Sequence, residues 1–248
     1  MSPAARERWQ VRSPLLLVAA FSWVALLCLL RITPTSALCA ALMPQSVQLG
    51  EVLVPLLLGW ILMLAAMMGP LLTLPVRHVR DRSFTRRRTR ATALFLIGYG
   101  LLWSAAGMLL SASAFFATKT IHELSLRLSV GAAIVLVWQL SPLKERCLNN
   151  CHSLTELSAF GAAADRDALR FGLSHGIWCV GSCWAIMLFA LLPCNGHLFT
   201  MAFASMWIFS ERLNKTTSRW DWRGPLHPFR IVIAQTRLRF DSQLRKRT

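Results

Sequence analysis

The chain has 248 residues, of which 55% are hydrophobic and 15% are charged, and its mean hydropathy is +0.48. A soluble domain carries about 25% charged residues, so this composition argues against one. The net charge of +16 is typical of nucleic-acid-binding proteins, but the distribution of the basic residues has a simpler explanation in a membrane protein.

Six apolar stretches predict transmembrane helices, because each comes close to the ~20 residues that span a bilayer. In chain order they cover residues 14–30, 52–76, 92–117, 128–142, 171–192 and 195–210. With both termini in the cytoplasm, the cytoplasmic segments hold 24 of the 27 Lys and Arg residues. Such an excess of positive charge on the inner side orients spans during insertion. We therefore predict an all-α, polytopic membrane helix bundle without a nucleic-acid partner.

The expected organisation is a transmembrane domain over residues 1–210, followed by a basic cytoplasmic tail over 211–248. We expect the protein in a bacterial inner membrane, where anionic lipid headgroups would contact the loop Arg77–Arg90 and the tail. The first stretch also has features of a cleaved signal peptide. We interpret it as a retained helix, because six spans account best for the charge asymmetry, and cleavage stays an alternative.

Proline and serine residues predict where two helices break. Pro70 follows Gly69 in the second stretch and removes a backbone hydrogen bond, so we expect a kink near its cytoplasmic half. Ser141 and Pro142 suit the cap and first position of a new helix on the cytoplasmic side. This new helix would carry the first of two cysteine pairs.

The two pairs are Cys147-x3-Cys151 and Cys179-x3-Cys183. Residues four apart on a helix have Cβ atoms ~5–6 Å apart, whereas a disulfide needs about 3.5–4.5 Å. Two thiolates at this spacing can still share one metal ion, because metal–sulfur bonds of ~2.3 Å bridge the gap. The cytoplasm is also reducing, which disfavours disulfides. The pairs therefore predict a metal site, while Cys39 and Cys194, on the outer side, are a weaker candidate for a disulfide.

Further soft or imidazole ligands surround these pairs or lie at a similar membrane depth. The complete set of predicted metal ligands is Cys147, Cys151, Cys179, Cys183, His152, His175, Met63, Met67, Met68 and Met187. Thiolate and thioether groups select Cu(I), while thiolate and imidazole suit zinc. Four thiolates around zinc would carry a net negative charge that Lys144 or Arg146 would have to offset near the bilayer. We therefore rank Cu(I) before zinc, and zinc before an iron–sulfur cluster.

Three stretches resemble a bacterial family of unknown function described as predicted metal-binding integral membrane proteins. They are residues 60–70, 139–151 and 172–187, and the likeness covers about residues 52–213. One departure is Gly181-Ser182, where many relatives are expected to have Gly-Cys. The resemblance implies metal binding in a membrane without a settled activity.

Metal binding and delivery to a partner protein is the function that these features predict. Transport is less favoured, because the outer halves of the predicted spans contain few soft ligands. A membrane thiol–disulfide oxidoreductase, in which Cys147 and Cys179 meet across two helices, is one alternative, and a structural subunit without a metal is another. The sequence contains no nucleophile–base arrangement and no phosphate-binding glycine loop, which argues against an ordinary hydrolase or a nucleotide-driven pump.

Overall fold

The computed structural model describes residues 3–32, 49–158, 160–193 and 196–213, and all regular structure in these ranges is helical. The all-α prediction is therefore confirmed for this part of the chain. The α-helices are α1 (Pro3–Ile32), α3 (Leu49–Met68), α4 (Thr73–Asp81), α5 (Arg88–Thr120), α6 (Leu124–Gln139), α7 (Pro142–Cys151), α8 (Gly161–Leu191) and α9 (His197–Leu213), with 3-10 turns η1 (Gly69–Leu72) and η2 (Thr85–Arg87).

Each of the six predicted spans overlaps a helix, but fewer helices are long and apolar enough to cross a membrane. Three segments in the described ranges meet that condition, namely Leu57–Asp81, Thr85–Thr120 and Gly161–Leu191. A fourth would be formed by α6 and α7 together, which are bent by 68° relative to each other. The apolar part of α1, Arg12–Cys28, is shorter. The count of six spans stays a prediction.

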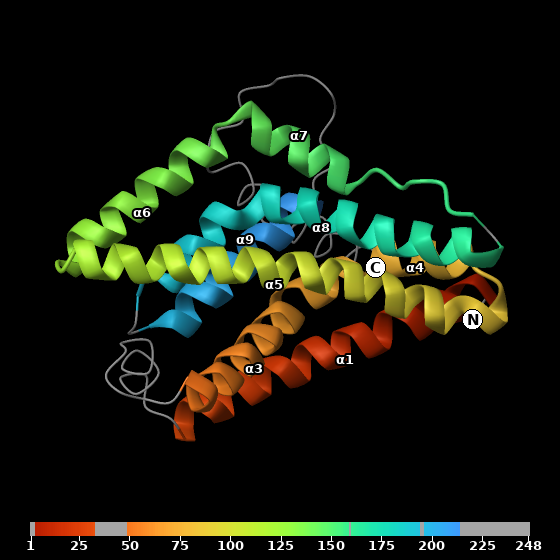
Figure 1. Cartoon of the computed structure of the whole chain (residues 1–248), viewed down its shortest axis with the longest axis horizontal. Helices are drawn as coiled ribbons and strands as arrows, with labels where there is room; N and C mark the ends of the chain where they lie inside the picture. Colours follow the sequence, from red (N-terminus) through yellow and green to blue (C-terminus); the bar gives the residue numbers. More distant parts are fainter. Residues whose placement is uncertain (1–2, 33–48, 159, 194–195, 214–248) are drawn as a thin grey trace, which may run out of the picture.

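Helices α5 and α8 form the main helix–helix contact of the molecule and lie side by side along its long axis (Figure 1). They run parallel, because Phe95 lies against Gly172 and Leu102, further along α5, lies against Gly176, further along α8. A Cβ atom on Gly172 would stand 2.2 Å from the carbonyl oxygen of Phe95. The two backbones approach this closely only because glycine lacks a side chain.

The predicted break at Gly69-Pro70 is confirmed. Helix α3 ends at Met68, the 3-10 turn η1 contains both residues, and α4 begins at Thr73. Helix α1 packs over the break, since a Cβ atom on Gly69 would lie 3.3 Å from that of Ala19. The loss of the proline N–H, together with this close contact, explains why α3 does not continue into α4.

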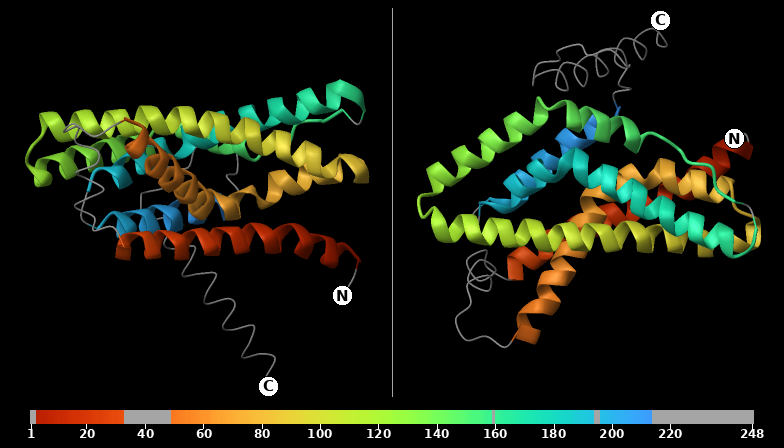
Figure 2. Two further views of the ribbon diagram at one scale, coloured as in Figure 1. Left: turned by 60° about the horizontal axis from the view of Figure 1, so that its bottom comes forward. Right: turned by 45° about the horizontal axis from the view of Figure 1, so that its top comes forward.

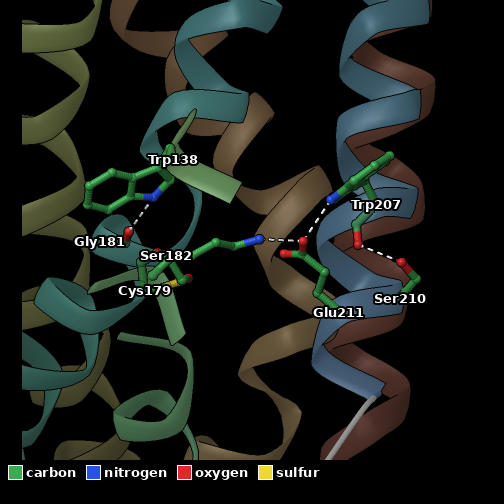
Figure 3. A network of polar contacts seen from close by, with 8 residues as sticks. Trp138, Cys179, Gly181, Ser182, Trp207, Ser210 and Glu211 are labelled. Carbon is green, nitrogen blue, oxygen red and sulfur yellow. Dashed lines mark hydrogen bonds and ion pairs between the residues drawn. The ribbon is translucent and has the colours of Figure 1, made fainter. Parts of the chain in front are cut away.

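The predicted helix restart at Ser141-Pro142 is also confirmed. The Ser141 hydroxyl accepts a hydrogen bond from the N–H of Leu143 at 3.2 Å, and Pro142 opens α7. Figure 2 shows α7 turning away from the direction of α6. The indole N–H of Trp138, near the end of α6, donates to the carbonyl oxygen of Gly181 at 3.1 Å (Figure 3). These contacts hold the cysteine-bearing helix α7 against α8.

Helix α8 begins well before the predicted span at residue 171. Its first turns carry Asp165, whose carboxylate bridges Arg87 at 2.9 Å and Arg90 at 2.7 Å. Residues 161–168, which precede the apolar stretch, are therefore part of this helix. Polar residues extend the helix beyond its apolar part because they pair with the arginines at the start of α5 and in η2.

Candidate metal site

The sulfur of Cys179 is the centre of a buried polar cluster. Cys179 lies near the middle of α8 with 1% of its surface exposed. An Nη2 nitrogen of Arg212, from the last turn of α9, donates to its Sγ atom at 3.1 Å. The hydroxyl oxygen of Tyr99, from α5, lies 3.3 Å from the same sulfur. Helices α5 and α9 therefore both direct a polar group at one cysteine of α8.

Two further thiols complete what we call the thiol cluster, formed by Cys151, Cys179 and Cys183. The thiols of Cys151 and Cys183 are both within hydrogen-bonding reach of the Cys179 sulfur. Cys151 comes from the end of α7, and Cys183 lies one turn after Cys179 on α8. The Cys183 thiol also donates to the carbonyl oxygen of Cys179 at 3.0 Å. The structure thus brings three of the four predicted cysteines together.

Cys147 does not join the thiol cluster. It is only partly buried, and a Cβ atom on Gly181 would lie 2.7 Å from its sulfur. Two residues along an α-helix correspond to a rotation of about 200°, so Gly181 and Cys179 face opposite sides of α8. The expectation that all four thiols share one ion stays a prediction that would require α7 to move.

The two histidines have different surroundings. His175 is buried one turn before Cys179, with its ring about 6 Å from those of Phe95, Tyr99 and Phe171. His152 caps the end of α7. Its Nδ1 lies 2.8 Å from the Leu148 carbonyl oxygen and its Nε2 lies 3.4 Å from that of Arg212. His175 remains the stronger candidate for a ligand, because both ring nitrogens of His152 already face backbone oxygens.

The predicted methionines lie in the same hydrophobic core as the thiol cluster. All are at most 3% exposed, and they are Met63, Met67, Met68 and Met187. Burial of this kind is also what ordinary flexible core packing produces. That one of these thioether sulfurs binds the ion stays a prediction.

Lys144 does not face the thiol cluster as a free charge. Its buried ammonium group pairs with Glu211, which also accepts a hydrogen bond from the Trp207 indole at 2.7 Å (Figure 3). Arg146, the other basic residue expected to offset thiolate charge, is exposed. The positive charge at the cluster comes instead from Arg212.

Arg212 and Tyr99 contact Cys179 but are absent from the ligands predicted from the sequence. Burial disfavours the charge of Arg212, but the nearby Cys179, Cys151 and Cys183 outweigh this effect and raise the pKa of its guanidinium group. Among the residues that the structure describes, its buried Nε atom has no hydrogen-bond partner. The one available signal was the acidic–basic pair Glu211-Arg212 at the end of the last apolar stretch.

Ser182, which replaces an expected cysteine, lies at the edge of the thiol cluster. It is buried, and its hydroxyl donates to the Cys179 carbonyl oxygen at 2.8 Å. The Ser182 side chain is also within hydrogen-bonding reach of Cys151. A cysteine at this position would therefore add a fourth sulfur to the cluster.

The thiol cluster is not a finished coordination shell. Within the described ranges, no three His, Cys, Asp or Glu side chains already stand in a metal-binding arrangement. Cys183 points its thiol at a backbone oxygen, and Cys179 is held by Arg212 and Tyr99. The five cysteines in these ranges are free thiols, while Cys39 and Cys194 lie outside the described residues. Binding an ion requires Cys183 to turn away from that oxygen.

A protein-family model described as PpoB2, copper chaperone, matches residues 57–225. The chain belongs to this family. The PpoB2 match covers more than half of the chain, includes the whole thiol cluster and extends past residue 213, where the resemblance seen in the sequence was expected to end. No curated protein and no solved structure matches the chain.

Proposed function

We propose that this protein binds Cu(I) as its cargo on the thiol cluster, within a bacterial inner membrane, and delivers it to an acceptor protein. The observation that carries the proposal is the meeting of three buried thiols, from α7 and α8, at the sulfur of Cys179. Membership of the PpoB2 copper chaperone family supports copper as the cargo.

Cu(I) suits the donor set better than zinc. Thiolate and thioether sulfurs select Cu(I), and the thiols of Cys151 on α7 and Cys183 on α8 are both within hydrogen-bonding reach of Cys179. A structural zinc ion takes four ligands in a tetrahedron. The thiol cluster provides three, so zinc would have to recruit a fourth such as His175.

The position of Cys147 supports delivery rather than permanent storage. Cys147 lies one turn before Cys151 on α7 and is less buried than the thiol cluster. A copper ion can pass between cysteines on neighbouring turns by exchanging one thiolate at a time. The acceptor protein would take the ion from this more exposed end. In the bilayer, anionic headgroups would contact the Arg77–Arg90 segment and the basic tail.

The test is metal analysis of the full chain purified in detergent. Cu(I) binding is measured by competition with a chromogenic Cu(I) chelator for the wild type and for the triple variant Cys151→Ser, Cys179→Ser and Cys183→Ser. Cys28→Ser is the matched control, because Cys28 is an exposed thiol on α1. We expect the triple variant to lose stoichiometric copper and the control to retain it. Equal copper content in all three proteins would contradict the proposal.

The second candidate function is thiol–disulfide exchange. The specific observation in its favour is the contact between Cys151 and Cys179, which lie on different helices and so escape the spacing limit of an in-helix pair. The two thiols would pass two electrons and two protons to a disulfide substrate, which becomes two thiols. Free thiols are counted before and after exposure to oxidised glutathione. A loss of two thiols that maps to this pair would favour exchange, whereas an unchanged count would exclude it.

A further inference from the structure

The immediate surroundings of the thiol cluster carry one unbalanced positive charge. Arg212 contacts Cys179 through a guanidinium nitrogen, and no carboxylate in the described ranges forms an ion pair with it. The other buried cation, Lys144, is neutralised by Glu211. His175, which is buried among aromatic rings, adds no fixed charge.

A single positive charge matches one particular form of the cargo. Cu(I) held by two thiolates carries a net charge of minus one, and beside Arg212 the whole unit is neutral. Cu(I) held by three thiolates would leave a net negative charge in a buried site, which is costly there. The charges around the thiol cluster therefore favour a two-thiolate copper unit.

We propose that Arg212 is a positioning residue that stays hydrogen-bonded to Cys179 after copper has bound and compensates the charge of the copper–thiolate unit. This inference rests on the proposed function and concerns the same site. A metal-bound sulfur keeps lone pairs that accept N–H groups, and such outer hydrogen bonds typically change metal affinity by about 10- to 100-fold when removed. In the part of the chain that the structure describes, the buried Nε atom of Arg212 has no hydrogen-bond partner, whereas its Nη2 atom contacts the Cys179 sulfur.

Arg212 could instead occupy the position that the copper ion takes, and this role predicts the opposite change in copper affinity when the arginine is removed. If the guanidinium group only fills the place of the missing ion, copper must displace it before binding. Removing the arginine would then strengthen copper binding. The sign of the change in affinity separates charge compensation from displacement.

The first experiment compares Cu(I) affinities of the full chain in detergent by chelator competition. Arg212→Gln removes the charge, and Arg212→Lys retains it. Arg86→Gln makes the same chemical change at an exposed arginine and is the control. We expect a loss of about 10- to 100-fold for the glutamine variant, substantial recovery for the lysine variant and no change for the control. An unchanged or tighter glutamine variant, or a lysine variant as weak as it, would overturn the inference.

A second experiment uses the wild type alone and does not depend on whether a variant folds. Arginine modification by phenylglyoxal is mapped by mass spectrometry with and without Cu(I). Arg212 should stay protected in both states, and increased reactivity after copper loading would overturn the inference. The triple serine variant described above keeps the two failures distinct. If the triple serine variant loses copper but the Arg212 variants or the phenylglyoxal mapping give the contrary result, the proposed function stands and only the role of Arg212 is wrong.

Discussion

The Nη2 atom of Arg212 lies 3.1 Å from the sulfur of Cys179, so the last turn of α9 meets the middle of α8. This interaction joins a permanently charged group to a soft metal ligand. The contact also makes the four cysteines unequal, because Cys179 is the thiol on which the other donors converge.

Single cysteine variants should lose Cu(I) affinity unequally, with the largest loss at Cys179. Cys179→Ser should lower Cu(I) affinity by more than the about 10- to 100-fold that outer-shell changes cost, because it removes the shared sulfur. Cys147→Ser should bind with nearly the wild-type affinity, since Cys147 lies against Gly181 on the other side of α8. Chelator competition measures both. Equal losses at the two positions would show that α7 moves to bring Cys147 into the shell.

Ser182→Cys should strengthen copper binding. The new thiol would lie beside Cys151 and offer Cys179 another partner for a two-thiolate copper unit, without the turn away from a backbone oxygen that Cys183 has to make. An increase of about tenfold, or 1.4 kcal/mol, is expected in the same chelator assay. Ser182→Ala is the control, because it removes the hydroxyl without adding a ligand. A cysteine variant no tighter than the alanine variant would contradict the placement of Ser182 at the site.

Gly98→Ala should destabilise the protein and weaken the contact between Tyr99 and Cys179. A Cβ atom at this position would lie 2.6 Å from the carbonyl oxygen of Leu169, and overpacking of this kind typically costs about 1–3 kcal/mol. Gly100→Ala, on the same helix, meets nothing within 4 Å and should be neutral or stabilising by up to about 1 kcal/mol. Thermal unfolding in detergent compares the two. Similar unfolding temperatures would argue against the close approach of α5 and α8.

Glu211→Met should destabilise the protein strongly, because it leaves the buried ammonium group of Lys144 without its partner. Breaking a buried ion pair in this way costs about 3–5 kcal/mol. The double variant Lys144→Met and Glu211→Met should recover most of that loss, although the Trp207 indole also loses its acceptor. Unfolding measurements on the single and double variants test the coupling. Additive losses would mean that the two residues act independently.

Much of the helical framework could be predicted from local patterns. The apolar stretches lie on helices, Pro70 ends α3, and Ser141 with Pro142 begins α7. Each of these features depends on neighbouring residues, which a sequence displays directly. The four-residue spacing of Cys179 and Cys183 likewise predicts that they share a helix face.

The rest of the site depends on how helices cross, which local patterns do not reveal. Cys147 and Cys151 have the same spacing, yet the angle of α7 against α8 brings only Cys151 to the cluster. Arg212 is distant from Cys179 in sequence and reaches it only because α9 packs on α8. Tyr99 reaches the sulfur through the glycine-lined contact of α5 with α8.

The parallel course of α5 and α8 has a consequence for unloading. Two parallel helices need a connection that runs back along their length, and here α6 and α7 form that connection between α5 and α8. The last ten residues of this connection form α7, which carries one of the three clustered sulfurs. The other two lie on α8, whose backbone packs closely against that of α5. An outward movement of α7 would therefore detach one copper ligand, Cys151, and leave the packed pair of α5 and α8 undisturbed.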